Sequence, residues 1–256
     1  MSASLSIFII TKNEFDRLER TIAAVRDLSD DIVVIDSGSS DGTIELAQSL
    51  GARVIYNPWP GYGAQKRFGE DQCRHAWMLN IDADEVVTHE LKEAIRSALS
   101  TDNQAPCAFK TDIIEMFPGE IHPHPWAFRI SPVRLYHRDI GRYNTSPVHD
   151  RVDILPGTTV HHLAGMIEHR SVRSLGDELI KLNAYSDSQA DDIDEKGRTF
   201  SALRLILEFP LAFLKAYVTR RHCVRGLYGF MTAMNYAFFR YLRLAKYWER
   251  RLGRRA

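Results

Sequence analysis

The first hundred residues alternate short apolar runs with helical patterns, and this alternation restricts the fold more than any other feature of the sequence. Continuous apolar runs are typical of strands that are buried on both faces of a parallel sheet. The predicted strands are 5–10, 31–36, 53–56 and 76–81, and the predicted helices are 14–27, 42–50, 64–75 and 88–99. Repeated strand–helix units of this size predict an α/β fold with a mostly parallel, Rossmann-like sheet.

Polar segments follow three of the predicted strands directly, at residues 11–14, 36–41 and 82–85. Open parallel sheets bind their ligands beyond the carboxyl ends of the strands. We therefore expect these three segments to meet at one edge of the sheet and to form a ligand site there.

The pattern changes after about residue 105. Short strands are predicted at 106–112, 133–138 and 147–154, and helices at 172–190 and 200–248. The short strands are interpreted as an extension of the same sheet, and the helices as a C-terminal addition.

The acidic segment Asn80-Ile-Asp-Ala-Asp-Glu85 is the strongest indication of chemistry. Three carboxylates within four residues repel one another unless a positive charge lies between them. A divalent cation with oxygen ligands supplies that charge in many sites, and it can bridge carboxylates to a diphosphate. The alternative is a solvated acidic loop that caps helix 88–99.

Two further segments point to a phosphate-containing ligand. Asp36 ends a strand, where its carboxylate can accept hydrogen bonds from a base or a ribose, although a plain turn in which Asp41 caps helix 42–50 is an alternative. In Gly61-Tyr-Gly-Ala-Gln-Lys66 the glycines permit close backbone approach, and Lys66 can neutralise a phosphate. A glycine turn before a basic helix start is the alternative for this segment.

The net charge of zero hides a strong asymmetry. Residues 198–256 contain 13 Lys and Arg but 2 Asp and Glu, and the rest of the chain is correspondingly acidic. Aromatic residues alternate with these basic residues, which is typical of helices that lie in the interface of an anionic membrane. Packing of the helices on the catalytic domain is the alternative. A nucleic-acid partner is not predicted, because no recognised binding motif accompanies the charge.

The apolar segments 203–218 and 226–239 are shorter than the roughly 20 residues that a membrane-spanning helix needs. The N-terminal segment lacks the basic start of a secretory signal. The three widely spaced cysteines form no disulfide framework and suit a reducing compartment. These features predict a cytoplasmic protein that is peripheral to the membrane.

Four segments occur in an order and spacing that resemble glycosyltransferase family 2, which has the GT-A nucleotide-sugar-binding fold. They are TKNE (11–14), VVIDSGSSDGT (33–43), GYGAQK (61–66) and NIDADE (80–85). RLYHR (134–138), PVHDRV (147–152) and the later His169, Arg173 and Lys181-Leu-Asn183 resemble its lipopolysaccharide core β-glucosyltransferases. The resemblance implies a GT-A catalytic domain over 1–170, with a donor half (1–100) and an acceptor half (101–170). A helical region that associates with the membrane surface would then cover 171–256.

The resemblance also implies roles for individual residues. Thr11, Glu14 and Asp36 would face the uridine of a UDP-sugar donor, and Lys66 would lie near the base or the diphosphate. Asp82 would reach the ribose or the metal. The metal ligands would be Asp84, Asp82 and His169, and the ion would be Mg²⁺ or Mn²⁺. A structural role for His169 is the alternative.

Asp150 is the predicted general base, because an inverting transfer needs a carboxylate that removes the acceptor hydroxyl proton. A salt bridge to Arg151 or Arg138 is the alternative for this residue.

The sequence therefore predicts an inverting, metal-dependent hexosyltransferase that moves glucose from UDP to the lipopolysaccharide inner core, peripheral to the inner membrane. A polyprenyl-phosphate sugar transferase and a non-catalytic nucleotide-sugar-binding protein of the same fold are the alternatives. A nucleotidyltransferase is disfavoured, because TKNE replaces the glycine-rich loop that this chemistry uses after the first strand.

Overall fold

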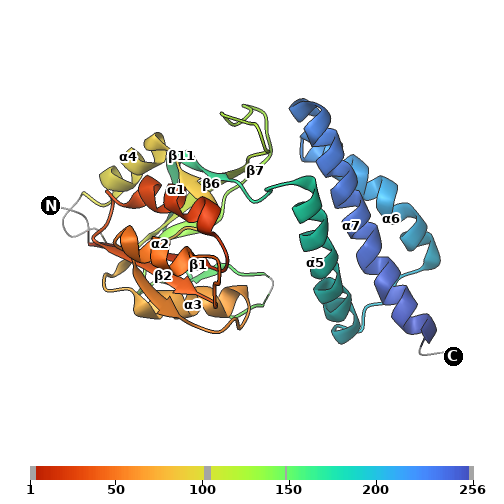
Figure 1. The fold of residues 1–256 in the computed structure, drawn as a ribbon, viewed down its shortest axis with the longest axis horizontal. Helices are drawn as coiled ribbons and strands as arrows, with labels where there is room; N and C mark the ends of the chain where they lie inside the picture. Colours follow the sequence, from red (N-terminus) through yellow and green to blue (C-terminus); the bar gives the residue numbers. More distant parts are fainter. Residues whose placement is uncertain (1–3, 101–104, 148, 254–256) are drawn as a thin grey trace. The chain divides into compact units, whose positions relative to one another are not determined.

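The first four strands of the sheet run parallel, in the spatial order β3-β2-β1-β4. Two of these strands, β1 and β2, are labelled in Figure 1. The structure is a computed structural model that describes residues 4–100, 105–147 and 149–253. The strands are β1 (Leu5–Thr11), β2 (Asp31–Asp36), β3 (Arg53–Tyr56) and β4 (Trp77–Asn80). The helices between them are α1 (Phe15–Val25), α2 (Thr43–Ser49) and α3 (Tyr62–Gln72), and α4 (His89–Ala98) follows β5. The α/β class and the parallel core predicted from the sequence are confirmed.

Antiparallel strands extend the sheet beyond β4, in the order β8-β6-β11-β5, and β7 pairs with β6. These strands are β5 (Glu85–Val87), β6 (Ala108–Glu115), β7 (Arg129–Ile130), β8 (Val133–His137) and β11 (Val160–His169). A separate hairpin joins β9 (Gly141–Tyr143) to β10 (Val152–Ile154). Of the strand predicted over 147–154, residues Val152–Ile154 form β10. Val148 lies outside the described residues.

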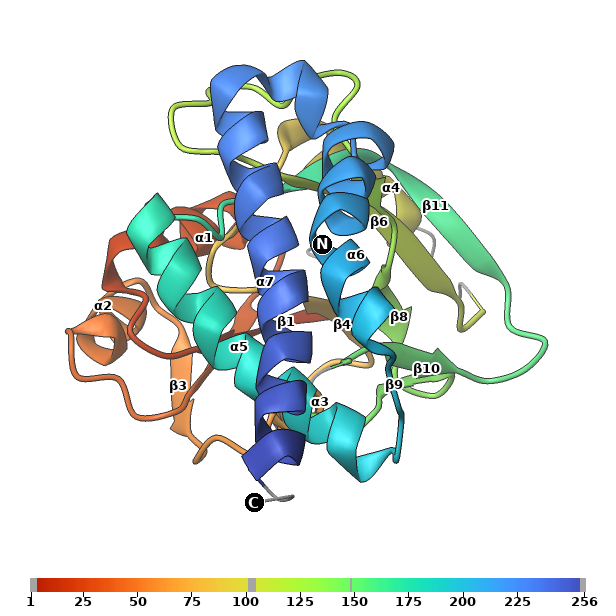
Figure 2. The same cartoon turned by 90° about the vertical axis from the view of Figure 1, so that its right-hand side faces the viewer.

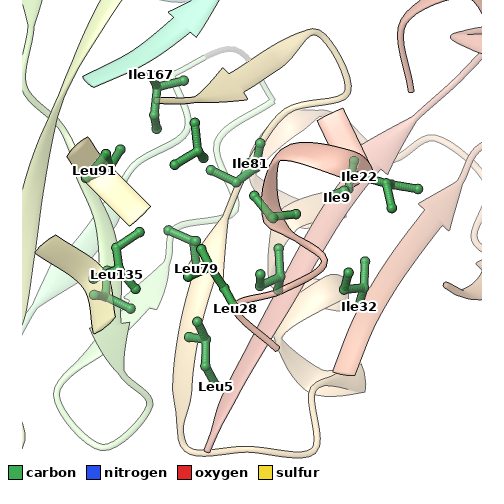
Figure 3. Packing of buried hydrophobic residues seen from close by; sticks show 14 of the residues in the cluster. Leu5, Ile9, Ile22, Leu28, Ile32, Leu79, Ile81, Leu91, Leu135 and Ile167 are labelled. Atoms are coloured by element: carbon green, nitrogen blue, oxygen red, sulfur yellow. The ribbon is translucent and has the colours of Figure 1, made fainter. Parts of the chain in front are cut away.

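Alternation along the strands divides the core into two layers, because successive strand residues face opposite sides of a sheet. Leu5, Ile7 and Ile9 of β1 face α1, α2 and α4, whose side chains complete the larger apolar cluster (Figure 3). Phe8 and Ile10 face the other side, where residues of α3 and the β9–β10 hairpin cover them. The sheet is therefore buried on both faces, and its strand ends are left for binding.

The start of α2 differs from the prediction. The N-cap is Gly42, which has a φ of +92°, and not Asp41. The Asp41 carboxylate accepts a hydrogen bond from the backbone of Thr43 at 3.1 Å and another from Phe15 N at 3.2 Å. It therefore still satisfies a free N–H of the first turn, from one position further out.

The chain divides into two compact units. The sheet unit comprises the chain up to Ile114 together with Arg129–Ser171, and the helical unit comprises Glu115–Phe128 and Val172–Ala256. The segment Glu115–Phe128 thus belongs with the helices, although it lies between β6 and β7 in the sequence.

Three long helices form the helical unit, and α7 lies between α5 and α6 (Figure 2). They are α5 (Leu175–Glu195), α6 (Ala202–Leu214) and α7 (Gly226–Gly253), and the turns η1 (Lys215–Thr219) and η2 (His222–Arg225) connect the last two. Ile193, Leu244 and Tyr247 form a buried apolar cluster between α5 and α7. Among the described residues, no helix is both long enough and apolar enough to cross a membrane.

Candidate active site

The carboxyl ends of β1, β2 and β4 meet at one edge of the sheet. Thr11 and Asp36 are direct partners in the β1–β2 register, and β4 lies on the other side of β1 and ends at Asn80. The segments predicted to meet at this edge therefore follow neighbouring strands. The acidic residues Asp82, Asp84 and Glu85 follow β4 directly.

The acidic segment folds into a tight turn. Glu85 N donates to the Asp82 carbonyl at 3.0 Å, and Asp82 N donates to Glu85 Oε2 at 2.8 Å. Glu85 is buried at the start of β5, so it stabilises the turn and does not face solvent. Burial raises the pKa of Glu85 despite its pairing with Arg134.

Arg134 of β8 supplies a positive charge beneath the turn. Its guanidinium lies 2.6 Å from Glu85 Oε1 and 3.4 Å from Asp82 Oδ2, and it donates to Asn80 Oδ1 at 2.5 Å. Tyr143 of β9 donates to the same Asn80 oxygen at 2.8 Å, and burial raises the pKa of its hydroxyl to about 12. Arg134 lies in the RLYHR segment, but no role for it was predicted from the sequence.

Lys66 of α3 joins two of the predicted site carboxylates. Its Nζ lies 2.9 Å from Asp82 Oδ1 and 2.8 Å from Asp150 Oδ2, and the residue is 3% exposed. Burial alone would raise the pKa of Asp82, but Lys66 and Arg134 hold it well below the usual range. Burial would likewise lower the Lys66 pKa, whereas Asp82 raises it. Both groups are therefore charged at neutral pH.

Asp150 thus lies within the acidic site. The alternative partners predicted for it are engaged elsewhere, since Arg151 pairs with Asp153 at 2.9 Å and Arg138 donates to backbone carbonyls. The structure brings Asp150, Lys66 and Asp82 together, although these residues are separated by up to 84 positions in the sequence.

Asp84 contacts the side chains of His169 and Arg17. His169 Nε2 lies 3.4 Å from Asp84 Oδ1, and Arg17 Nη1 lies 3.4 Å from Asp84 Oδ2. Burial would raise the pKa of Asp84, but the hydrogen bond and charge of His169, together with Arg17, lower it. His169 reaches this position because β11 pairs with β5 and places His169 opposite Glu85. Neither of these strands was predicted from the sequence.

The residues predicted to face uridine lie in different environments. The Asp36 carboxylate is buried and accepts hydrogen bonds from the backbone N–H groups of Gly38 and Ser39, both at 2.8 Å. Glu14 accepts from Arg17 Nε at 2.7 Å. The Thr11 hydroxyl is buried and has no hydrogen-bond partner among the described residues. The Thr11 hydroxyl therefore keeps both its donor and its acceptor capacity for a ligand.

The predicted metal ligands do not form a closed cage. Across residues 4–100, 105–147 and 149–253, no three His, Cys, Asp or Glu side chains are gathered as a metal-binding group. Asp82 Oδ1 is nevertheless buried and accepts no hydrogen bond of good geometry from a described residue. Mg²⁺ is usually held by one or two carboxylates together with substrate phosphates and water, so an incomplete protein cage suits that ion.

Comparison with known proteins identifies the family. The family model described as glycosyl transferase family 2 matches residues 6–157. The chain belongs to glycosyltransferase family 2. The match covers the parallel strands and extends through the acidic turn to Asp150, and it ends before His169.

Relatives along nearly the whole chain are also glycosyltransferases. A glycosyltransferase of Rickettsia prowazekii is 38% identical over 250 residues, which cover 94% of this chain and 86% of the relative. The lipopolysaccharide core biosynthesis glycosyltransferase LpsC of Rhizobium meliloti is 32% identical over 260 residues, covering 96% and 92%. The chain is therefore a glycosyltransferase, and its resemblance to lipopolysaccharide core enzymes is confirmed.

Among solved structures, the chain is similar to residues 1–349 of TarS from S. aureus. The sequence identity is 14%, the TM-score is 0.48, and the match covers 97% of this chain and 91% of that chain. The order of the strands described above agrees with the GT-A fold that the family resemblance predicted.

Proposed function

We propose that the chain is an inverting, metal-dependent glycosyltransferase that transfers a hexose, most simply glucose, from UDP to the lipopolysaccharide inner core at a membrane surface. The observation that carries the proposal is the grouping of Asp82, Asp150 and Lys66 at the carboxyl end of the sheet, with Asp84 two residues further along. The relationship to LpsC, which is named for lipopolysaccharide core biosynthesis, supports the choice of acceptor.

In this proposal the nucleoside of the donor binds across the ends of β1 and β2. The unpartnered Thr11 hydroxyl would bind it directly. Asp36 would act indirectly, because its carboxylate is already used to hold the backbone of Gly38 and Ser39 in place. The diphosphate would then approach Lys66 and the acidic turn, where positive charge is available.

The metal ion would be Mg²⁺ or Mn²⁺, held by Asp84 and Asp82. Asp82 Oδ1 now faces Lys66 Nζ at 2.9 Å and would face the ion in its place, and His169 would either join the ligands or continue to pair with Asp84. When bound, such an ion offsets the negative charge that develops on the diphosphate leaving group. Arg17 now contacts Asp84, and Lys66 contacts Asp82. When the ion binds, each cationic side chain would either move away from its carboxylate or share that carboxylate with the ion.

Asp150 would act as the general base. As the acceptor oxygen forms a bond to the anomeric carbon, the bond from that carbon to the diphosphate oxygen breaks, and Asp150 takes the acceptor hydroxyl proton. Because Lys66 pairs with both Asp150 and Asp82, it fixes the base relative to the donor side of the site.

The proposed membrane contact involves exposed aliphatic residues of the helical unit. The exposed residues recur every three or four positions along α6 and η1, with one adjacent pair, and they are Leu203, Ile206, Leu207, Leu211, Leu214 and Val218. The sequence from 201 to 219 contains one acidic residue, Glu208. Its carboxylate is buried and pairs with Arg204, Arg240 and Arg243. An aliphatic stripe without exposed acidic groups, on a basic unit, suits an anionic lipid surface.

Nucleotide release by purified protein tests the proposed transfer. Donors would be UDP-glucose, UDP-galactose and ADP-heptose with Mn²⁺, and acceptors would be a truncated core lipid and a polyprenyl phosphate. We expect UDP release from UDP-glucose with the core lipid and at least 100-fold less with Asp150→Asn, since base catalysis contributes about 10²–10⁴-fold. Release with the polyprenyl phosphate alone would favour the first alternative, and UDP-sugar binding without turnover would favour the non-catalytic one.

Vesicle sedimentation tests the membrane contact separately. Ile206→Glu on α6 is expected to weaken binding to phosphatidylglycerol-containing vesicles. Ile180→Glu on α5 is a matched control, because Ile180 and Ile206 are both 71% exposed. Equal binding by both variants and the unchanged protein would contradict the assignment of α6 as the lipid-facing element.

A further inference from the structure

Two exposed aromatic residues, Trp59 and Tyr62, lie beside the acidic site and take no part in the transfer proposed above. Their rings meet edge to face, with centroids 4.8 Å apart and an interplanar angle of 89°. Trp59 is 46% exposed and Tyr62 is 43% exposed. Large aromatic rings gain stability from burial, so an exposed pair next to a binding site is available to a ligand.

The position of Tyr62 relative to the site follows from the helix geometry. Tyr62 and Lys66 are four residues apart on α3 and so lie on the same face, one turn from each other. Lys66 is buried between Asp82 and Asp150, whereas Tyr62 is close to half exposed. Tyr62 therefore lies on the solvent side of the carboxylates, at the entrance to the site.

Backbone contacts place the pair on the same side as Asp150. Tyr62 N donates to the Pro147 carbonyl at 3.2 Å, and Gly63 N donates to the Ser146 carbonyl at 2.9 Å. A Cβ atom added at Gly63 would lie 2.5 Å from the Asn144 carbonyl oxygen, so the two segments are in close contact. The start of α3 is thus joined to the segment that leads to Asp150.

The electrostatic environment of Tyr62 agrees with this position. Partial burial raises the pKa of its hydroxyl, and the charges of Asp82 and Asp150 raise it further. The hydroxyl therefore stays protonated at neutral pH and can donate a hydrogen bond to a ligand.

We propose that Trp59 and Tyr62 form the binding subsite for a pyranose ring of the acceptor, and that they orient its reacting hydroxyl toward Asp150. The apolar C–H face of a sugar ring would pack on the aromatic rings, and its hydroxyl groups would face the Tyr62 hydroxyl and the carboxylates. This inference rests on the proposed function, and in particular on Asp150 as the base. The donor nucleoside is assigned to the ends of β1 and β2, so the aromatic pair is assigned to the acceptor.

Calorimetric binding to the intact protein tests the subsite without requiring turnover. The probe is a deacylated lipopolysaccharide inner-core oligosaccharide, titrated in the presence of UDP and Mn²⁺, and UDP-glucose affinity is measured in parallel. Trp59→Ala and Tyr62→Ala are expected to weaken oligosaccharide binding about tenfold, which is the size of one good aromatic contact. Tyr62→Phe keeps the ring and is expected to stay within about threefold of the unchanged protein.

Trp126→Ala is the matched control, because Trp126 is also exposed but lies in the helical unit. Unchanged oligosaccharide affinity in Trp59→Ala and Tyr62→Ala would overturn the inference and leave the proposed function intact. Loss of UDP-glucose affinity with oligosaccharide affinity kept would also overturn it, because the pair would then serve the donor. If the unchanged protein does not bind the oligosaccharide, the proposed acceptor is wrong, and the proposed acceptor subsite is then wrong as well.

Discussion

Replacement of Lys66 by Met tests whether one buried cation holds the site carboxylates together. Methionine keeps most of the aliphatic stem and removes the charge, so Asp82 and Asp150 would face each other without a cation between them. Removing one partner of a buried ion pair costs about 3–5 kcal/mol. The side chains of Asp82 and Asp150 are 27% and 23% exposed, which admits water and places the expected loss at about 3 kcal/mol.

The assay is urea denaturation at pH 7.5 of Lys66→Met, Asp150→Asn and the double variant. Asp150→Asn removes one of the two repelling charges, so the double variant should lose less stability than the sum of the single losses, with a coupling of about 1–3 kcal/mol. Lys92→Met is the control, since Lys92 pairs with the exposed Asp27 at 2.7 Å and its loss should cost at most about 1 kcal/mol. Additive losses within about 0.5 kcal/mol would refute the reasoning.

Two further predictions concern backbone fit and pH. Gly63→Ala should lower transfer activity sharply, because the added Cβ would lie 2.5 Å from the Asn144 carbonyl oxygen. Gly176→Ala is the control and should leave activity unchanged, because the nearest atom to its Cβ would be 3.7 Å away. Equal activities of the two variants would contradict this prediction. Burial and Arg225 lower the pKa of His222 to about 4, from 6.5 in the unfolded chain, so the unfolded state takes up its proton first as the pH falls. Thermal stability should therefore decline between pH 6.5 and 4, and less steeply in His222→Gln; parallel pH curves would count against this account.

The parallel part of the sheet could be predicted because its strands are continuous apolar runs. The predicted bounds of 31–36 and 53–56 agree with β2 and β3. The strands β5 and β11 were missed for different physical reasons. Glu85–Val87 is only three residues long and begins within the acidic segment. In Val160–His169 the apolar residues are interrupted by Gly165 and flanked by histidines, and much of the strand is exposed.

The carboxylates of the site and Lys66 were predictable as site residues, but Arg134 and Arg17, which also compensate the carboxylates, were not. Asp82 and Asp84 stand out as a local cluster after a strand. Arg134 lies 52 positions from Asp82, and Arg17 lies 67 positions from Asp84, so no local pattern connects these pairs. The pairings depend on strand order, which places β8 next to β4. The need for compensating charge was evident from the sequence, whereas Arg134 and Arg17 could be identified as sources of that charge only from the fold.

The central claim is that Asp84 and Asp82 hold a cation that binds the diphosphate of the donor. Calorimetric titration of UDP with and without Mn²⁺, for the unchanged protein and Asp84→Asn, tests it most directly. The account predicts that Mn²⁺ increases UDP affinity at least tenfold in the unchanged protein, or about 1.4 kcal/mol, and that Asp84→Asn loses this increase. The same Mn²⁺-dependent affinity in Asp84→Asn would contradict the account.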